Sequence, residues 1–245
     1  MNYYPLKTCP GFNAGITLRD SGASKAPYAH ANFAFYVGDQ YSDVLSNREH
    51  LATKIRIPCT RWILPKITHS IHFQKVSEND KGSGAYSEDT SIPDCDALYT
   101  FDPSLLLGVF SADCATLVIT EQSSKLCGVL HAGWPGSVNR LVADFLTHLS
   151  HEESIDLSRC QISFGPNIQP ENFEVGQDVL EQAKQKWVNP ERFFTQCSPT
   201  HFLFDFNAMN IEQCLECGIL PSHIHRYPEN PSDYPDRYYS YRRTK

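Results

Sequence analysis

Two short motifs place a thiol and an imidazole at the ends of apolar segments. Cys114 closes residues 111–114 (SADC), and His131 opens residues 131–134 (HAGW). Between them lie an apolar run, 115–120 (ATLVIT), a polar turn, and a second apolar run that ends at residue 130. This order is typical of a β-hairpin, which would bring Cys114 and His131 close together at its open end.

A third candidate, His72, lies between Ile71 and Phe73 after another short apolar stretch. One thiolate and two imidazoles suit zinc, with a fourth position left open for water or substrate. The same residues also allow Cys114 to act as a nucleophile with His131 as its base, and spacing alone does not separate the two alternatives. A second metal site at Cys214, Cys217 and the histidines 223 and 225 is disfavoured, because both cysteines fall in the last turn of a predicted helix.

Arg48 lies at the centre of the apolar stripe of a predicted helix, residues 40–55. A charge at that position needs a partner or a cavity, because an isolated buried charge is costly. One interpretation is an ion pair with an interior carboxylate. The other is an anion anchor that lines the cavity of the candidate metal site, since a guanidinium matches phosphate or carboxylate oxygens.

The remaining pattern interleaves helices with strands and hairpins, which favours an α+β fold with layered mixed β-sheets and outer helices. Helices are predicted at 40–55, 138–149, 176–187 and 208–217, and strands at 32–37, 69–76, 105–110, 115–120, 126–131, 161–165 and 201–206. A polar segment at 81–92 is expected to be a surface loop that could cover a site. Because no linker or repeat is visible, residues 1–245 are predicted to form a single domain.

The composition narrows the class of protein. The net charge is −7, and basic residues do not cluster except at Arg242 and Arg243, so nucleic acid is not an expected partner. No apolar run approaches the ~20 residues that a membrane-spanning helix needs, so no membrane association is expected. The nine cysteines, without a recognisable secretion signal, predict a reduced cytoplasmic protein.

The motifs taken in order resemble the YfiH-like family, also called laccase-domain or purine nucleoside phosphorylase proteins. The resemblance covers roughly residues 26–243. It is carried by the segments 26–32 (APYAHAN), 37–39 (VGD), 47–48 (NR), His72, 96–100 (DALYT), 112–114 (ADC), 131–134 (HAGW), 165–168 (GPNI), 173–176 (FEVG), Asp205 and 240–243 (SYRR).

The resemblance implies a YfiH-like α/β/β/α arrangement and a zinc ion held by His72, Cys114 and His131. It implies a substrate site that includes Arg48, Asn32 and Asp113, with catalysis by Cys114, His131 and Arg48. The expected substrates are small molecules, namely purine nucleosides and phosphate, and the expected reactions are phosphorolysis and adenosine deamination.

The alternatives are an amidase that edits peptidoglycan precursors, with zinc or a cysteine nucleophile, and a degenerate zinc-binding member without turnover. Polyphenol oxidation is disfavoured, because a multicopper centre needs many more clustered histidines.

The chain departs from the family pattern at several positions near these motifs. Tyr36 replaces a usual histidine, Thr116 a usual proline and Pro135 a usual basic residue, while Ser70 and Phe73 replace the residues that usually flank the histidine motif. The loss of a basic residue at Pro135 weakens the expectation of phosphate in particular, whereas the proposed ligands are retained.

Overall fold

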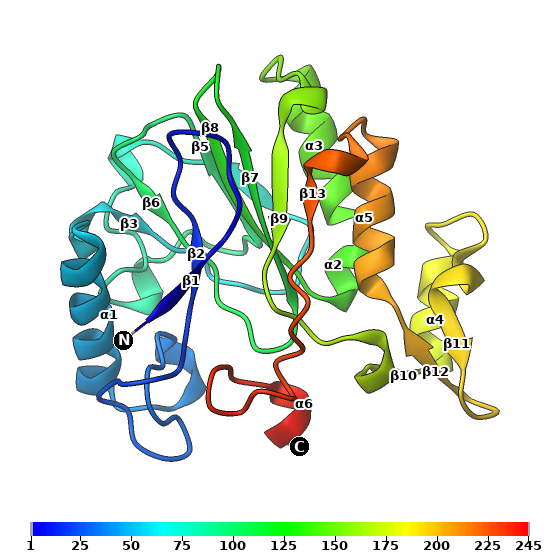
Figure 1. The fold of residues 1–245 in the computed structure, drawn as a ribbon, viewed down its shortest axis with the longest axis horizontal. Helices are drawn as coiled ribbons and strands as arrows, with labels where there is room; N and C mark the ends of the chain where they lie inside the picture. The colour runs from blue at the N-terminus through cyan, green and yellow to red at the C-terminus, as the bar shows by residue number, and fades with distance from the viewer. Residues whose placement is uncertain (1, 245) are drawn as a thin grey trace.

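A central six-stranded mixed sheet organises the computed structural model, which describes residues 2–244 (Figure 1). Its strand order is β13-β9-β7-β8-β5-β4, with parallel pairs at both edges and antiparallel pairs between them. The strands are β4 (Phe73–Lys75), β5 (Ala97–Thr100), β7 (Ala115–Glu121), β8 (Leu126–Ala132), β9 (Gln161–Phe164) and β13 (Ile224–His225).

The β7–β8 hairpin lies in the middle of this sheet. Thr116 pairs with His131 in antiparallel register, and Cys114 directly precedes β7. The apolar runs on either side of a polar turn therefore form the hairpin that their pattern predicted, with both candidate side chains at its open end.

The smaller sheets lie outside this centre. One has three strands in the order β10-β12-β11, and two have a single pair each, β1–β2 antiparallel and β3–β6 parallel. Their bounds are β1 (Tyr3–Pro5), β2 (Gly15–Thr17), β3 (Trp62–Ile63), β6 (Leu106–Leu107), β10 (Glu174–Gly176), β11 (Phe194–Gln196) and β12 (His201–Phe204).

Three of the four predicted helices are confirmed to within a few residues, and the fourth is divided. The helices are α1 (Tyr41–Ile55), α2 (Trp134–Val138), α3 (Leu141–His151), α4 (Gln177–Lys184), α5 (Phe206–Glu216) and α6 (Tyr241–Thr244). The helix predicted at 138–149 is interrupted because Arg140 adopts a left-handed conformation, φ 70°, between α2 and α3.

The hydrophobic clusters define four layers, in agreement with the predicted α/β/β/α arrangement. On one face of the central sheet, Leu117 and Leu130 pack with Phe145 of α3 in the main core. On the other face, Leu98 and Val129 pack against Ile63 of β3. The outer face of the β3–β6 pair packs on α1, at the opposite side of the molecule from α3 and α5 (Figure 1).

Several predicted strands are shorter than expected, and one is absent. Residues 32–37 were expected to be extended, but Phe35–Val37 forms a 3₁₀ helix. The cause is local: the side-chain oxygen of Asn32 accepts from the backbone N–H of Ala34, and Arg48 binds the carbonyl of Phe33. The segments predicted at 69–76 and 105–110 pair only over Phe73–Lys75 and Leu106–Leu107.

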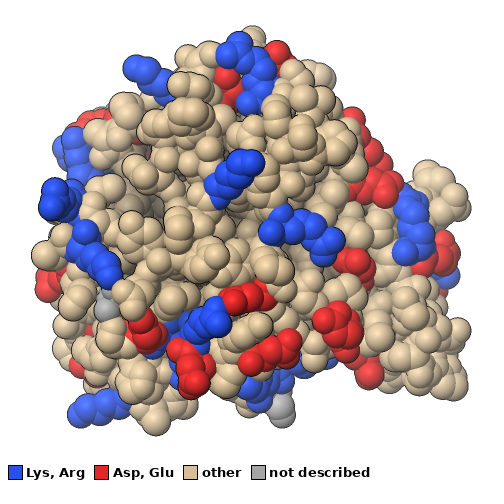
Figure 2. Space-filling model, viewed as in Figure 1, with Lys and Arg blue, Asp and Glu red and all other residues tan. Residues whose placement is uncertain are grey.

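Acidic and basic side chains are mixed on the face drawn in Figure 2, where Lys and Arg residues are separated by acidic and uncharged ones. Among residues 2–244, no helix is both long and apolar enough to cross a membrane.

Candidate metal centre

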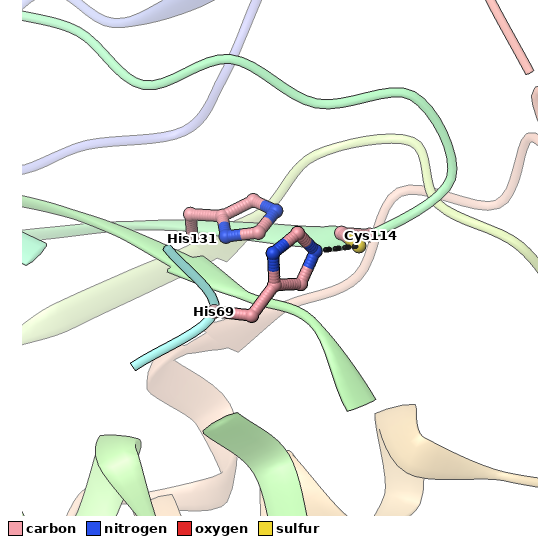
Figure 3. Close-up of side chains that lie close together, drawn as sticks. All are labelled: His69, Cys114 and His131. Carbon is pink, nitrogen blue, oxygen red and sulfur yellow. Dashed lines mark hydrogen bonds between the residues drawn. The ribbon is translucent and has the colours of Figure 1, made fainter. Parts of the chain in front are cut away.

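Three side chains capable of binding a metal converge at the open end of the β7–β8 hairpin (Figure 3). They are His69, Cys114 and His131, and their ligand atoms all lie within 4.8 Å of one another. His69 Nε2 lies 3.9 Å from Cys114 Sγ, and the two imidazole rings are almost perpendicular, with centroids 4.9 Å apart. Cys114 and His131 come from the hairpin, whereas His69 comes from the turn before β4.

Asp96 holds the side chain of His131 and the backbone of His69. Its Oδ1 accepts from His131 Nδ1 at 2.8 Å and from the backbone N–H of His69 at 3.1 Å. Its Oδ2 accepts from the backbone N–H groups of Thr68 and Ser70 and from the hydroxyl of Ser70. The carboxylate is fully buried, and these donors compensate for its loss of water. Because Nδ1 of His131 is taken by Asp96, its Nε2 is left to face the cluster.

The cluster shifts the acidity of its own groups. Burial alone would raise the pKa of Cys114, but His131 and His69 outweigh burial and lower the pKa to about 7. Burial alone would lower the pKa of His131, but Asp96 and Cys114 outweigh it and raise the pKa to about 9. A thiol with a pKa near neutrality is partly present as the thiolate, and the thiolate is the form that binds a metal or attacks a substrate.

Two backbone positions next to the cluster, His69 and Gly133, have restricted conformations or contacts. His69 has φ 59°, a left-handed conformation that is uncommon for residues with a Cβ. Gly133, which follows β8, approaches the cluster so closely that a Cβ built there would lie 2.7 Å from the His69 ring and 3.1 Å from Cys114 Sγ. A glycine is therefore required at the start of α2 for the two ligands to keep their positions.

His72 lies outside this group, which differs from the sequence prediction. Its Nδ1 contacts Asp94 Oδ2 at 2.9 Å, and both side chains are more than half exposed. The reason is that the turn at 68–70 wraps around Asp96 and presents His69, whereas His72 directly precedes β4 with its side chain paired to Asp94. The third member of the cluster is therefore three residues earlier than expected.

Arg48 is positioned differently from both of its predicted roles. It is 1% exposed, and its guanidinium donates to backbone carbonyls of Phe33, Gly84 and Ala85. It also lies 4.0 Å from the centroid of the Phe35 ring. Carbonyl dipoles and aromatic faces, not a carboxylate or an open cavity, compensate for its charge, so Arg48 joins the loop at 33–37 to the predicted surface loop at 81–92.

Asn32 and Asp113, the other predicted substrate-site residues, are also buried and bonded within the protein. The Asn32 amide donates to the Ala34 carbonyl and to Asp39 Oδ2. Asp113 Oδ2 accepts from the Ser240 hydroxyl and the Arg242 backbone N–H, while its Oδ1 has no partner in the part of the chain that the structure describes. Neither side chain is presented to solvent.

Sequence reasoning missed His69 and the role of Asp96. The available signal was the polar turn 68–70 (THS) just before a strand, together with an acidic residue at the start of the apolar run 97–99. Periodicity could not choose between His69 and His72, because the choice depends on a hydrogen-bonding carboxylate 27 residues further along the chain.

Taken together, the group offers a thiolate and two imidazoles, with one imidazole buried and the other two side chains at the surface. His131 is 3% exposed, Cys114 is partly exposed and His69 is exposed. A metal held here would be supported from inside the protein and open toward solvent, as in catalytic metal sites.

Comparisons with known proteins agree with the fold and the motifs. The family model described as multi-copper polyphenol oxidoreductase laccase matches residues 13–245. Purine nucleoside phosphorylase YlmD of Geobacillus stearothermophilus is 31% identical over 237 residues, which cover 96% of this chain and 86% of that protein.

A protein named adenosine deaminase RL5, from an unknown prokaryotic organism, is 28% identical over 183 residues, which cover 75% of this chain and 70% of that protein. The crystal structure of the hypothetical protein YfiH from Bacillus licheniformis has the same fold, with a TM-score of 0.93 at 23% identity over 98% of this chain and 91% of that one. The chain therefore belongs to the family described as multi-copper polyphenol oxidoreductase laccase, the laccase-domain family that its motifs predicted.

Proposed function

We propose that this chain is a zinc-dependent enzyme that acts on purine nucleosides, by phosphorolysis, by deamination of adenosine, or by both. The observation that carries the proposal is the convergence of His69, Cys114 and His131 at an open surface site. The names of relatives supply the substrate class, since they include purine nucleoside phosphorylases and an adenosine deaminase. The same names argue against the polyphenol oxidation that the family description suggests.

The donor set supports zinc. Zinc is commonly bound by thiolate and imidazole, and catalytic sites use three protein ligands. Bonds of about 2.0–2.3 Å in tetrahedral geometry separate two ligand atoms by roughly 3.3–3.8 Å. The Cys114–His69 separation of 3.9 Å is close to this range, and all three ligand atoms lie within 4.8 Å of one another, so the side chains would need to move closer together to bind the ion. When bound, zinc supplies a Lewis acid at the open position.

The residues of the chain prepare this site before any ligand arrives. Asp96 accepts the Nδ1 proton of His131 and so orients Nε2, the nitrogen that would bind the metal once it has lost its own proton, toward the cluster. The two imidazoles favour the thiolate of Cys114. A substrate approaches from the side of Cys114 and His69, because His131 is closed off by the sheet.

Arg48 does not enter this proposal as a phosphate ligand. Its donors already serve three carbonyls, and releasing them would leave buried acceptors without partners. Phosphorolysis would thus need another phosphate-binding group, which makes the choice between the two reactions an experimental question.

The test is a product analysis with zinc-loaded protein. Adenosine and inosine are incubated with and without phosphate, and the products are separated by chromatography. Phosphate-dependent release of adenine or hypoxanthine identifies phosphorolysis, and phosphate-independent conversion of adenosine to inosine identifies deamination. Unchanged nucleosides under all conditions would refute the proposal.

A second candidate function follows from the order Asp96–His131–Cys114. A carboxylate orients an imidazole that in turn lowers the pKa of a thiol, which is the arrangement of a cysteine hydrolase such as an amidase. Activity on a peptidoglycan precursor that persists in chelator, with alkylation of Cys114 abolishing it, would favour this candidate. Loss of that activity in chelator would exclude it.

A further inference from the structure

Asp113, the residue before Cys114, combines three unusual features. Its φ is 91°, in the region that favours glycine. It is 8% exposed, and its Oδ1 is buried with no hydrogen-bond partner among residues 2–244. Its Oδ2 binds residues more than 120 positions further along the chain, namely the Ser240 hydroxyl at 3.0 Å and the Arg242 backbone N–H at 2.7 Å. Strained backbone and unpaired buried groups persist only where the surroundings enforce them.

The partner segment is itself firmly attached. Ser240 Oγ also accepts from the Arg243 backbone N–H, and the Arg243 side chain donates to the carbonyls of Pro231 and Tyr238. Arg242 donates to the carbonyl of Glu174 and lies 5.3 Å from the Phe173 ring centroid. The segment 240–243 is thus a fixed support against which the Asp113 carboxylate is held.

The conformation of Asp113 decides where Cys114 points. A change of φ from the left-handed to the ordinary extended region would turn the following peptide and redirect the next side chain. In the conformation that Asp113 has, Cys114 Sγ lies 3.9 Å from His69 Nε2. The opposite side of the same turn is held by the main chain, since the Asp113 carbonyl accepts from the Ile168 N–H.

We propose that Asp113 is a positioning residue, whose carboxylate ties the segment 240–243 to the turn before Cys114 and thereby aims the thiolate at the metal. This inference rests on the metal-binding part of the proposed function. It assigns to the C-terminal segment a role in metal affinity, although no residue of that segment belongs to the cluster.

The experiment measures metal affinity and cobalt spectra on four variants. Ser240→Ala removes the hydroxyl link and leaves the turn intact. Asp113→Gly keeps the left-handed conformation at no steric cost but removes the carboxylate. Asp113→Asn keeps an oxygen acceptor and tolerates the conformation, so it should restore most of the affinity. Thr244→Ala is the matched control, because the Thr244 hydroxyl donates to the carbonyls of Ser240 and Tyr241 in its own segment.

We expect Ser240→Ala and Asp113→Gly to bind zinc about 10-fold more weakly, the lower end of what partners of metal ligands contribute. Their cobalt complexes should show a weaker thiolate-to-cobalt absorption band. Asp113→Asn should stay within about threefold of wild type, and Thr244→Ala should be unchanged. Urea unfolding of the metal-free proteins reports separately on stability.

Two results distinguish the possible failures. If wild type itself binds no zinc, the proposed function fails and the inference fails with it. If wild type binds zinc, and Ser240→Ala and Asp113→Gly match its affinity and its cobalt spectrum, the inference alone is overturned. The inference is also overturned if these variants lose unfolding free energy but keep wild-type zinc affinity, because the Asp113 carboxylate would then stabilise the fold only.

Discussion

Replacement of His69 should abolish tight metal binding, whereas replacement of His72 should not. The two histidines are three residues apart, yet only His69 lies within 4.8 Å of the other two ligand atoms. His69→Asn is preferable to His69→Ala, because asparagine tolerates the left-handed conformation, φ 59°, that alanine resists. His72→Asn is the matched control at an exposed position.

The expected loss of zinc affinity can be worked out from the share of the binding free energy that each ligand contributes. Zinc sites with four protein ligands bind with about 10–16 kcal/mol, so one ligand contributes roughly 3–4 kcal/mol. Loss of His69 should therefore weaken zinc binding by a factor of about 10²–10³. Loss of His72 removes an exposed pair with Asp94, an interaction worth about 0–1 kcal/mol in stability, and should change zinc affinity less than about twofold.

The assay is competition with a chromophoric chelator at constant pH, supported by metal analysis of the purified proteins. Circular dichroism of the metal-free variants confirms that they are folded. A His72→Asn protein that loses zinc while His69→Asn retains it would refute the reasoning. Equal retention by both would exclude His69 as a ligand.

Three further outcomes are expected. Asp96→Asn should lower zinc affinity about 10–100-fold in the same competition assay. The reason is that the amide cannot accept both from His131 Nδ1 and from the backbone N–H groups of the turn at 68–70. Wild-type affinity in this variant would show that Asp96 serves the fold only. Arg48→Met should lower the free energy of unfolding by about 3–5 kcal/mol in urea, since three carbonyls lose a buried charged donor, and a loss below about 1 kcal/mol would contradict its structural role. Glu153→Gln should destabilise by less than about 1 kcal/mol at neutral pH, because Lys75 and then Tyr99 hold the pKa of the Glu153 carboxyl below its usual value. Because the pKa of Glu153 is lower in the folded protein, its ionised form stabilises the fold at pH values above the ordinary pKa near 4.5, and this stability is lost as the pH falls through the folded-state pKa. The unfolding free energies of wild type and variant should therefore converge in acid. A difference that becomes larger in acid would contradict this sign.

The elements that could be predicted from sequence are those whose pattern is local. The β7–β8 hairpin follows from two apolar runs around a polar turn, and α1, α4 and α5 follow from their apolar stripes. Short strands such as β3 were not predicted, because two paired residues leave no periodicity, and β6 covers only two residues of the strand predicted at 105–110. The break between α2 and α3 was not predicted either, because it results from the left-handed conformation of one residue, Arg140.

The sequence predicted the type of site, a thiol with imidazoles, but not all of its residues. A thiol and an imidazole at the ends of paired strands identified Cys114 and His131. The third side chain depends on how the turn at 68–70 wraps around Asp96, a contact between distant parts of the chain. Arg48 was recognised as anomalous, yet its partners are carbonyl groups, which every residue carries and which no sequence pattern marks.

The central claim, that a metal held by His69, Cys114 and His131 supports turnover of purine nucleosides, is tested most directly by titrating zinc into metal-free protein while adenosine consumption is measured in phosphate buffer. We expect no turnover without metal, a linear rise up to one zinc per chain and a plateau beyond it. Full turnover in the metal-free protein, or no turnover at any zinc concentration, would contradict the claim.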